Sequence, residues 1–351
     1  MGVDLRFIPT AAKRVLDRKA FYAQLVVTDA CNLRCAYCDE YLADAPLVGL
    51  DALRRRVDRL DELGALVFDF LGGEPLLHPG LAELVAHAKS KRGGSNLATV
   101  ITNGFLLTRE NVRALSAAKL DFMQVSVDTL EPTELSQKAV RPLLPKLRLL
   151  AEEARFKVEI QTVLSERSVE EYADFRQALE GLPFSFGFSL RHEPGGRIAI
   201  RGRRYLELLE RHGVFEGVNF YGEHLREMLL GDDSRPWKCL AGSKFLYINA
   251  AGEAQWCGQQ RGWRIPLETL DLDGLAANDE HKPCESGCVI GCARMVSHTL
   301  GEPLRTLGAS LSLAGQSLRA RPAEPVGQGA AVFRSPCPER DQTGERSGQG
   351  R

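Results

Sequence analysis

The chain has 351 residues, of which 44% are hydrophobic and 26% charged, and its formal net charge is −1. This composition is ordinary for a globular protein, and the near-zero charge excludes bulk electrostatic attraction to nucleic acid or to an anionic membrane. No apolar run is long enough to span a bilayer and the N-terminal segment lacks a signal peptide's apolar core, so we expect a cytoplasmic location.

Six short, nearly continuous apolar runs predict buried parallel strands. They cover residues 23–28, 66–71, 97–102, 122–127, 157–163 and 184–190. Segments with helical spacing alternate with them, at residues 50–63, 81–90, 108–119, 143–154 and 169–179. Repeated strand-then-helix units imply right-handed crossovers and a parallel sheet. The sequence therefore predicts an α/β fold, a partial (β/α)6 barrel, with its functional site at the carboxyl ends of the strands.

The same pattern divides the chain into a lead-in over residues 1–20, the partial barrel over 21–198 and a helical linker over 199–235. A small cysteine-rich extension is expected over residues 236–300, and a tail follows over 301–351. From about residue 319 the tail is rich in Pro, Gly, Gln and charged residues, which cannot bury enough apolar surface to offset the entropy of ordering. We expect this part to be largely disordered.

Cysteines are the most informative part of the composition. Eight of the nine fall into two groups, Cys31, Cys35 and Cys38 near the start, then Cys239, Cys257, Cys284, Cys288 and Cys292; Cys337 lies in the tail. In a reducing compartment, closely spaced thiols favour metal binding or redox chemistry over disulfides.

The first group forms a CxxxCxxC motif directly after the first predicted strand. Three thiolates this close together can hold three irons of a cubane and leave the fourth iron without a protein ligand. Such an open position distinguishes a reactive metal site from a closed structural one. A zinc site is the alternative for this motif taken by itself. Tyr37 precedes the last cysteine and could pack against a bound adenine.

Three further motifs lie at the ends of the next three predicted strands. They are Gly72-Gly73-Glu74-Pro75, Thr102-Asn103-Gly104 and Ser126-Val127-Asp128. Each is weak alone, because Gly, Pro and Asn-Gly mark turns anywhere and Ser or Asp caps helices. In order, and each at a strand end over residues 20–195, the four motifs resemble those of the radical S-adenosylmethionine (SAM) superfamily.

The resemblance implies a [4Fe–4S] cluster on Cys31, Cys35 and Cys38, with SAM bound to its open iron. It implies that SAM is cleaved reductively to a 5′-deoxyadenosyl radical, which takes a hydrogen atom from the substrate, with a flavodoxin- or ferredoxin-type electron donor. Many relatives carry an Arg near the SAM carboxylate, and either Lys138 or Arg141 would take that role here. The expected SAM-binding residues are Tyr37, Gly72, Gly73, Glu74, Thr102, Asn103, Ser126, Asp128 and Lys138, with Glu74 facing the ammonium.

The second cysteine group begins on a predicted hairpin, with Cys239 and Cys257 at its ends and a turn at Ala251-Gly252. The hairpin and the cysteines that follow it together resemble the twitch or SPASM extension of some radical SAM enzymes. In those enzymes the extension holds auxiliary iron–sulfur clusters. Five cysteines suit one auxiliary [4Fe–4S] cluster and one spare thiol, with structural zinc as the alternative. The spare thiol is either a hydrogen donor or a small buried residue, and the sequence leaves its identity open.

These features predict a radical SAM oxidoreductase of a biosynthetic pathway that acts on a small metabolite or a peptide and yields an oxidised or cross-linked product. One alternative is a radical SAM epimerase with a cysteine hydrogen donor, and another is a non-catalytic iron–sulfur or zinc scaffold or sensor. The sequence does not identify the catalytic residues. Candidate substrate contacts are Gln161, Arg191, His192, Glu193 and Arg197.

Overall fold

The computed structural model describes residues 7–39, 41–42, 45–214 and 220–303. The region predicted to be disordered, with Cys337, lies outside the described residues. Within them, no helix is both long enough and apolar enough to cross a membrane.

Six parallel strands pair in chain order within one sheet. They are β1 (Tyr22–Thr28), β2 (Val67–Gly72), β3 (Leu97–Thr102), β4 (Phe122–Ser126), β5 (Lys157–Leu164) and β6 (Ser185–Leu190). Each boundary lies within one residue of the predicted one. The parallel sheet confirms the predicted α/β fold.

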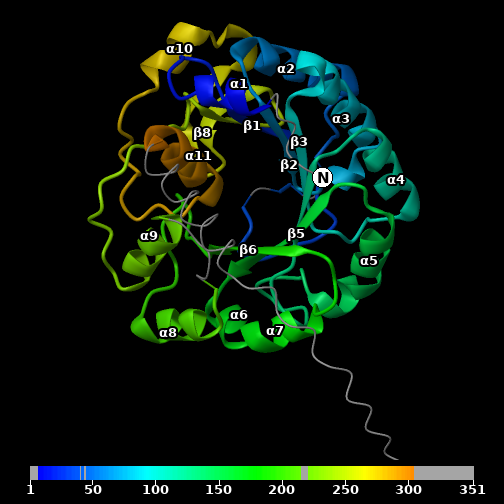
Figure 1. Cartoon of the computed structure of the whole chain (residues 1–351), viewed down its shortest axis with the longest axis vertical. Coiled ribbons are helices and arrows are strands. Elements are labelled where there is room, and N and C mark those ends of the chain that lie inside the picture. The colour runs from blue at the N-terminus through cyan, green and yellow to red at the C-terminus, as the bar shows by residue number, and fades with distance from the viewer. Residues whose placement is uncertain (1–6, 40, 43–44, 215–219, 304–351) are drawn as a thin grey trace, which may run out of the picture.

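Helices follow the strands and form an outer arc around them (Figure 1). They are α2 (Leu50–Leu63), α3 (Leu81–Ser90), α4 (Arg109–Ala117), α5 (Val140–Glu153), α6 (Glu166–Glu170) and α7 (Tyr172–Ala178). Helix α5 starts three residues before the predicted start at residue 143. Pro142 does not prevent this, because a proline in the first turn of a helix breaks no intrahelical hydrogen bond. The helix predicted over 169–179 is instead two, because Ser165 caps α6 and the backbone at Glu171 leaves the helical region.

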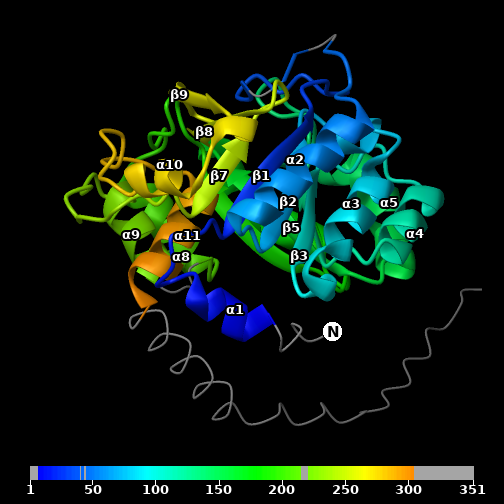
Figure 2. The ribbon, with the colours of Figure 1, turned by 90° about the horizontal axis from the view of Figure 1, so that it is seen from above.

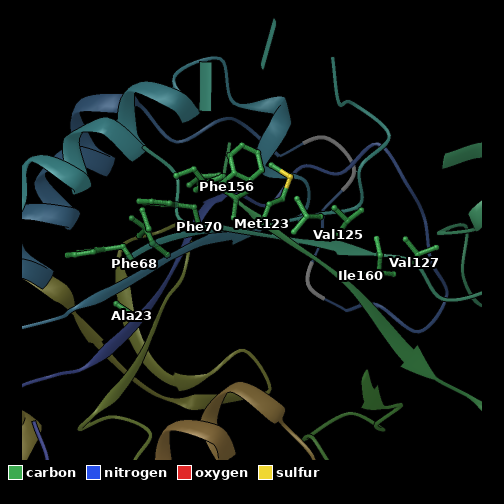
Figure 3. Packing of buried hydrophobic residues seen from close by; sticks show 14 of the residues in the cluster. Ala23, Phe68, Phe70, Met123, Val125, Val127, Phe156 and Ile160 are labelled. Atoms are coloured by element: carbon green, nitrogen blue, oxygen red, sulfur yellow. The ribbon is translucent and has the colours of Figure 1, made fainter. Parts of the chain in front are cut away.

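The core lies between the sheet and this arc of helices. Phe68 and Phe70 on β2 and Met123 and Val125 on β4 are fully buried there, and Figure 3 shows them on one side of the sheet. Alternate residues of a strand point to opposite faces. The other face is therefore lined by the intervening residues, and these include one polar row on the first three strands. In that row Gln24, Asp69 and Thr99 pair in register across β1, β2 and β3.

The C-terminal part extends this sheet. Strand β7 (Phe245–Ile248) pairs parallel to β1, and β8 (Glu253–Cys257) and β9 (Gln260–Pro266) follow antiparallel. Within the described residues the sheet therefore has nine strands, in the order β6-β5-β4-β3-β2-β1-β7-β8-β9. The predicted hairpin is present as β7 and β8. Neither the pairing of β7 with β1 nor the strand β9 was predicted. This pairing covers an edge of β1 whose backbone groups would otherwise lack partners.

The remaining helices close the open side of the barrel and its base. They are α1 (Phe7–Lys13), α8 (Arg203–Arg211), α9 (Phe220–Leu229), α10 (Leu272–Ala277) and α11 (Gly291–Gly301), with short 3₁₀ turns at Pro75–Leu77, Lys91–Gly94 and Leu267–Thr269. Helix α11 packs against α9 and β7. Helix α1 lies at the end of the barrel where the strands begin (Figure 2). Arg14 holds the segment that follows α1, because its Nε donates a hydrogen bond to Gly64 O at 2.9 Å.

We expect Phe70→Ala to lower the free energy of unfolding by about 3–5 kcal/mol, because the side chain is fully buried and leaves a cavity. Urea unfolding of the metal-free protein measures this change. The matched control is Leu16→Ala, at a side chain that is 91% exposed, which should change stability by no more than about 0.5 kcal/mol. Equal effects of the two substitutions would contradict the assignment of the core.

Candidate functional site

The three N-terminal cysteines line one cavity of about 280 Å³ at the carboxyl ends of the strands. The cavity brings together all but two of the residues expected to bind the cluster or SAM. Its wall includes Cys31, Cys35, Tyr37, Cys38, Gly72, Gly73, Thr102, Asn103, Ser126 and Lys138. The exceptions are Glu74 and Asp128.

Backbone and amide N–H groups surround the first two thiols of the motif. Cys31 Sγ accepts from Leu33 N at 3.4 Å and from Asn103 Nδ2 at 3.7 Å. Cys35 Sγ accepts from Gln137 N at 3.3 Å. Burial raises the pKa of Cys31, and these N–H groups oppose that rise. Metal ligation requires thiolates, so sulfurs that receive hydrogen bonds fit a metal-binding role.

Gly72 and Gly73 let the loop after β2 lie directly against the segment that leads to Cys31. Gly72 has a φ of +149°, and a Cβ there would lie 2.1 Å from the carbonyl oxygen of Thr28. A Cβ on Gly73 would lie 2.1 Å from the oxygen of Ala30. We expected these glycines to allow backbone to approach a ligand. Their closest neighbours are in fact the backbone that carries the cysteines.

Glu74 was expected to face the SAM ammonium, but its side chain is fully buried and does not line the cavity. Its carboxylate accepts from Thr102 Oγ1 at 2.6 Å, Asn103 N at 2.7 Å and Leu76 N at 3.0 Å. Burial raises its pKa to about 6, although these hydrogen bonds favour the ionised form. Glu74 therefore ties the loop after β2 to the loop after β3 and positions both.

Asp128 is the other exception, because it organises the wall of the cavity from behind. Its Oδ2 accepts from Tyr37 OH at 2.9 Å and from Ser136 Oγ at 2.6 Å, and Lys138 Nζ lies 3.5 Å away. Burial is the largest influence on Lys138 and disfavours its cation, but Asp128, Tyr37 and Cys35 together outweigh burial and raise the pKa of Lys138. Of the two cations proposed for the SAM carboxylate, Lys138 lines the cavity, whereas Arg141 is 74% exposed and pairs with Glu131.

A second cavity of about 330 Å³ adjoins the first, and Tyr37 and Val163 line both. Its wall also includes Asp128, Ser136, Ser165, Arg167 and Arg191. The sequence did not predict it, because Ser165 and Val163 at the end of β5 belong to no motif. Of the other candidate substrate contacts, His192 lines the first cavity, whereas Gln161, Glu193 and Arg197 line neither.

Four of the five later cysteines form a second group. Cys239, Cys257 and Cys288 are buried and Cys284 is half-buried. Burial raises the pKa of Cys239 and of Cys257 to about 12, and the charge of Cys288 adds to both rises. Cys284 acts on Cys239 and Cys288 in the same way, so the four sulfurs are neighbours. Thiols that repel each other's charge suit a cation or an iron–sulfur core that compensates it.

The fifth, Cys292, departs from that group. It lies in the first turn of α11 and lines the cysteine cavity. Its Sγ donates to Gln24 Oε1 at 3.7 Å. The spacing of four residues between Cys284, Cys288 and Cys292 suggested one set. Cys284 instead lies in a turn and Cys288 in a β-bridge with Arg197, both before the helix, and only Cys292 lies on the helix.

Comparison with known proteins tests the family that the sequence motifs predict. Residues 25–172 match the Radical SAM superfamily. The chain carries a radical SAM domain. Two curated relatives are GTP 3′,8-cyclases, from Pectobacterium atrosepticum (30% identity over 223 residues, 61% of this chain and 63% of that one) and Chlorobaculum tepidum (40% over 116 residues, 32% and 34%). The chain thus spans between one third and two thirds of the curated relatives it matches.

Solved radical SAM structures share the fold. Streptococcus suis SuiB aligns with a TM-score of 0.58 at 16% identity, over 80% of this chain and 70% of that one. The anSMEcpe structure with bound AdoMet and Cp18Cys peptide aligns at 0.57 and 15% identity, over 86% and 99%. A radical SAM domain uses a [4Fe–4S] cluster and SAM, and a cavity with three thiols on its wall fits that pair. In the described part of the chain, no three His, Cys, Asp or Glu side chains are arranged around a single metal ion.

The raised pKa of Glu74 predicts a pH dependence of stability for the metal-free radical SAM domain. The folded carboxyl, with a pKa of about 6, keeps its proton to higher pH than the unfolded one at 4.5. Its contribution therefore falls as pH rises through these two pKa values, by about 2 kcal/mol in total between roughly pH 3 and 7.5. Urea unfolding should show wild type losing this much relative to Glu74→Gln across that window. A constant difference between the two proteins would contradict the prediction.

Gly73→Ala should displace the segment before Cys31, because its Cβ would overlap the carbonyl of Ala30. We expect iron bound after anaerobic reconstitution to fall by roughly four per chain, the content of one cubane. The control is Gly262→Ala, where an added Cβ meets nothing within 4 Å and iron should be unchanged. Iron retained in full by Gly73→Ala with a native circular dichroism spectrum would show that this contact is dispensable.

Proposed function

We propose that the chain is a radical SAM enzyme that holds a [4Fe–4S] cluster through Cys31, Cys35 and Cys38 and acts on a small metabolite or a peptide. The observation that carries the proposal is the common cavity, where these thiols meet the loops after three successive strands. When bound, the reduced cluster and SAM supply a 5′-deoxyadenosyl radical that takes a hydrogen atom from the substrate. The role of the chain is to position both and to exclude competing hydrogen donors.

SAM fits across the two adjoining cavities. Lys138, held as a cation by Asp128, faces the cysteine cavity and suits the SAM carboxylate. Tyr37 lies between the cavities with its hydroxyl fixed by Asp128, so its ring can pack against the adenosine as that part extends into the second cavity. Thr102, Asn103 and Ser126 add polar groups at the strand ends. Glu74 acts as a positioning residue.

The four later cysteines, Cys239, Cys257, Cys284 and Cys288, are proposed to hold an auxiliary [4Fe–4S] cluster. Residues next to two of them, Gly258 and Val289, line the cysteine cavity, so a cluster there would stand directly behind the cavity wall. Such a cluster supplies a one-electron acceptor close to the substrate. This arrangement supports the expected oxidised or cross-linked product and therefore an oxidoreductase of a biosynthetic pathway.

Two substrate classes follow from the relatives. Because the curated relatives are named GTP 3′,8-cyclases, GTP is the first small molecule to test. SuiB has been solved with its precursor peptide SuiA, which makes a peptide the second class. A flavodoxin or ferredoxin is the proposed electron donor. A scaffold or sensor has no need for four strand-end motifs around one cavity, and it would not cleave SAM.

The Cys31→Ala, Cys35→Ala, Cys38→Ala triple variant tests the proposal. After anaerobic reconstitution, wild type should hold roughly eight irons and the variant roughly four, the content of two cubanes and of one. Wild type with dithionite and SAM should form 5′-deoxyadenosine, and the variant should form none. No 5′-deoxyadenosine from iron-loaded wild type would favour the scaffold. Roughly four irons in wild type and almost none in the variant would leave the C-terminal cysteines without a cluster.

A further inference from the structure

Lys282 is a buried lysine among the four later cysteines. Only 6% of its surface is exposed, and it stands two residues before Cys284. Its backbone N donates to Glu285 Oε1 at 2.8 Å, and the same oxygen accepts from Cys239 N at 2.7 Å. One carboxylate oxygen thus joins the segment of Lys282 to the segment that carries Cys239.

The side chain of Lys282 extends toward a third cysteine segment. Its Nζ lies 5.3 Å from the centre of the Trp256 ring, and Trp256 directly precedes Cys257. Nζ also donates to Asn278 O at 2.6 Å and to Glu280 O at 2.7 Å. These partners are two carbonyl oxygens and an aromatic ring, which stabilise an ammonium group but carry no net charge.

The nearest carboxylates pair with other basic groups. Asp279 Oδ1 lies 2.9 Å from Lys238 Nζ, and Glu285 Oε2 lies 2.7 Å from His281 Nδ1. Within the described ranges of the chain, Lys282 itself forms no ion pair with a carboxylate. A buried ammonium group without a paired carboxylate is costly unless another negative group lies close to it.

Cysteine sulfurs provide that negative group. Burial is the main cause that raises the pKa of Cys239 to about 12 and that raises the pKa of Cys284, and the Lys282 cation opposes both rises. Conversely, burial lowers the pKa of Lys282, and Cys239 comes before Glu285 and Asp279 among the charges that oppose this fall. Lys282 therefore lies close enough to these sulfurs to stabilise negative charge on them.

A cation in this place changes the energy of an electron added to the site. An iron–sulfur core held by four thiolates is anionic, and reduction adds one further negative charge. A fixed positive charge stabilises the more negative form more strongly, and burial keeps water and salt from screening it. Net charge and solvent exposure are among the factors that set the reduction potential of such clusters.

We propose that Lys282 raises the reduction potential of the auxiliary cluster, an inference that rests on the cluster proposed above for Cys239, Cys257, Cys284 and Cys288. A higher potential favours the oxidised product. The substrate radical gives one electron to this site and loses one proton, and an oxidised flavodoxin- or ferredoxin-type protein then takes the electron. The role of Lys282 is electrostatic, since it is neither a metal ligand nor a group that touches the substrate.

A redox titration followed by EPR tests this role without any turnover. The background is the Cys31→Ala, Cys35→Ala, Cys38→Ala triple variant, in which only the C-terminal cluster contributes a signal. Lys282→Gln removes the charge but keeps an N–H donor for the two carbonyls. At a fixed potential it should lower the ratio of reduced to oxidised cluster at least about tenfold, which is a shift of about 59 mV for one electron. Lys282→Arg keeps the charge, and its ratio should stay within about threefold of the background.

The matched control is Lys238→Gln, which removes a cation directly before Cys239 in the chain. The Lys238 side chain is 40% exposed and pairs with Asp279, so water and the carboxylate screen its charge. Its loss should change the ratio by no more than about threefold. An unchanged ratio in Lys282→Gln, or an equal change in Lys238→Gln, would overturn the proposal.

Iron content separates an electrostatic role from a structural one. Lys282→Gln and a second neutral variant, Lys282→Met, should each hold the same iron and sulfide as the background variant. Loss of iron from both would make Lys282 a residue that holds the site together, and would overturn its role in setting the potential. No cluster signal from the background variant itself would instead overturn the auxiliary cluster proposed for the four cysteines.

Discussion

The backbone contact between the loop after β2 and the segment after β1 is the constraint on which the cavity depends. No side-chain atom fits there, because the carbonyl oxygens of Thr28 and Ala30 occupy the places that Cβ atoms of Gly72 and Gly73 would take. Gly73 N also donates to Thr28 O at 2.8 Å. With Glu74 joining the same loop to the end of β3, three strand ends form one rigid edge that presents the cysteines.

The fold could be predicted from the sequence because β1 and β2 are buried on both sides, and β3, β4 and β5 bury one face fully and the other face in part. Their apolar runs are continuous, and parallel topology then places the residues after each run at one edge of the sheet, as Thr102 and Ser126 illustrate. The pairing of β7 with β1 could not be predicted in this way. It joins residues more than two hundred positions apart, and no local pattern in either strand specifies the partner.

The directions of side chains account for the features of the site that the sequence could not predict. A motif places Glu74 and Asp128 near the cysteine cavity, yet neither side chain lines it. Both accept hydrogen bonds from groups such as Thr102 and Tyr37 that do line it, and Asp128 lines the second cavity instead. Cys292 shares its spacing with Cys288, but the start of a helix between them separates their directions. The signal that could have been read is Gln24, a polar residue in an otherwise apolar stretch of β1.

The late partner of β1 has a consequence for synthesis of the chain. Tyr22 to Leu25 pair with Phe245 to Ile248, so one edge of the first strand stays uncovered until the hairpin leaves the ribosome. At about 5–20 residues per second, that wait is of the order of ten seconds or more. An open apolar strand edge is a template for pairing with other chains, and long-range pairing is slow to form. The nascent barrel would therefore benefit from a chaperone before its last strands arrive.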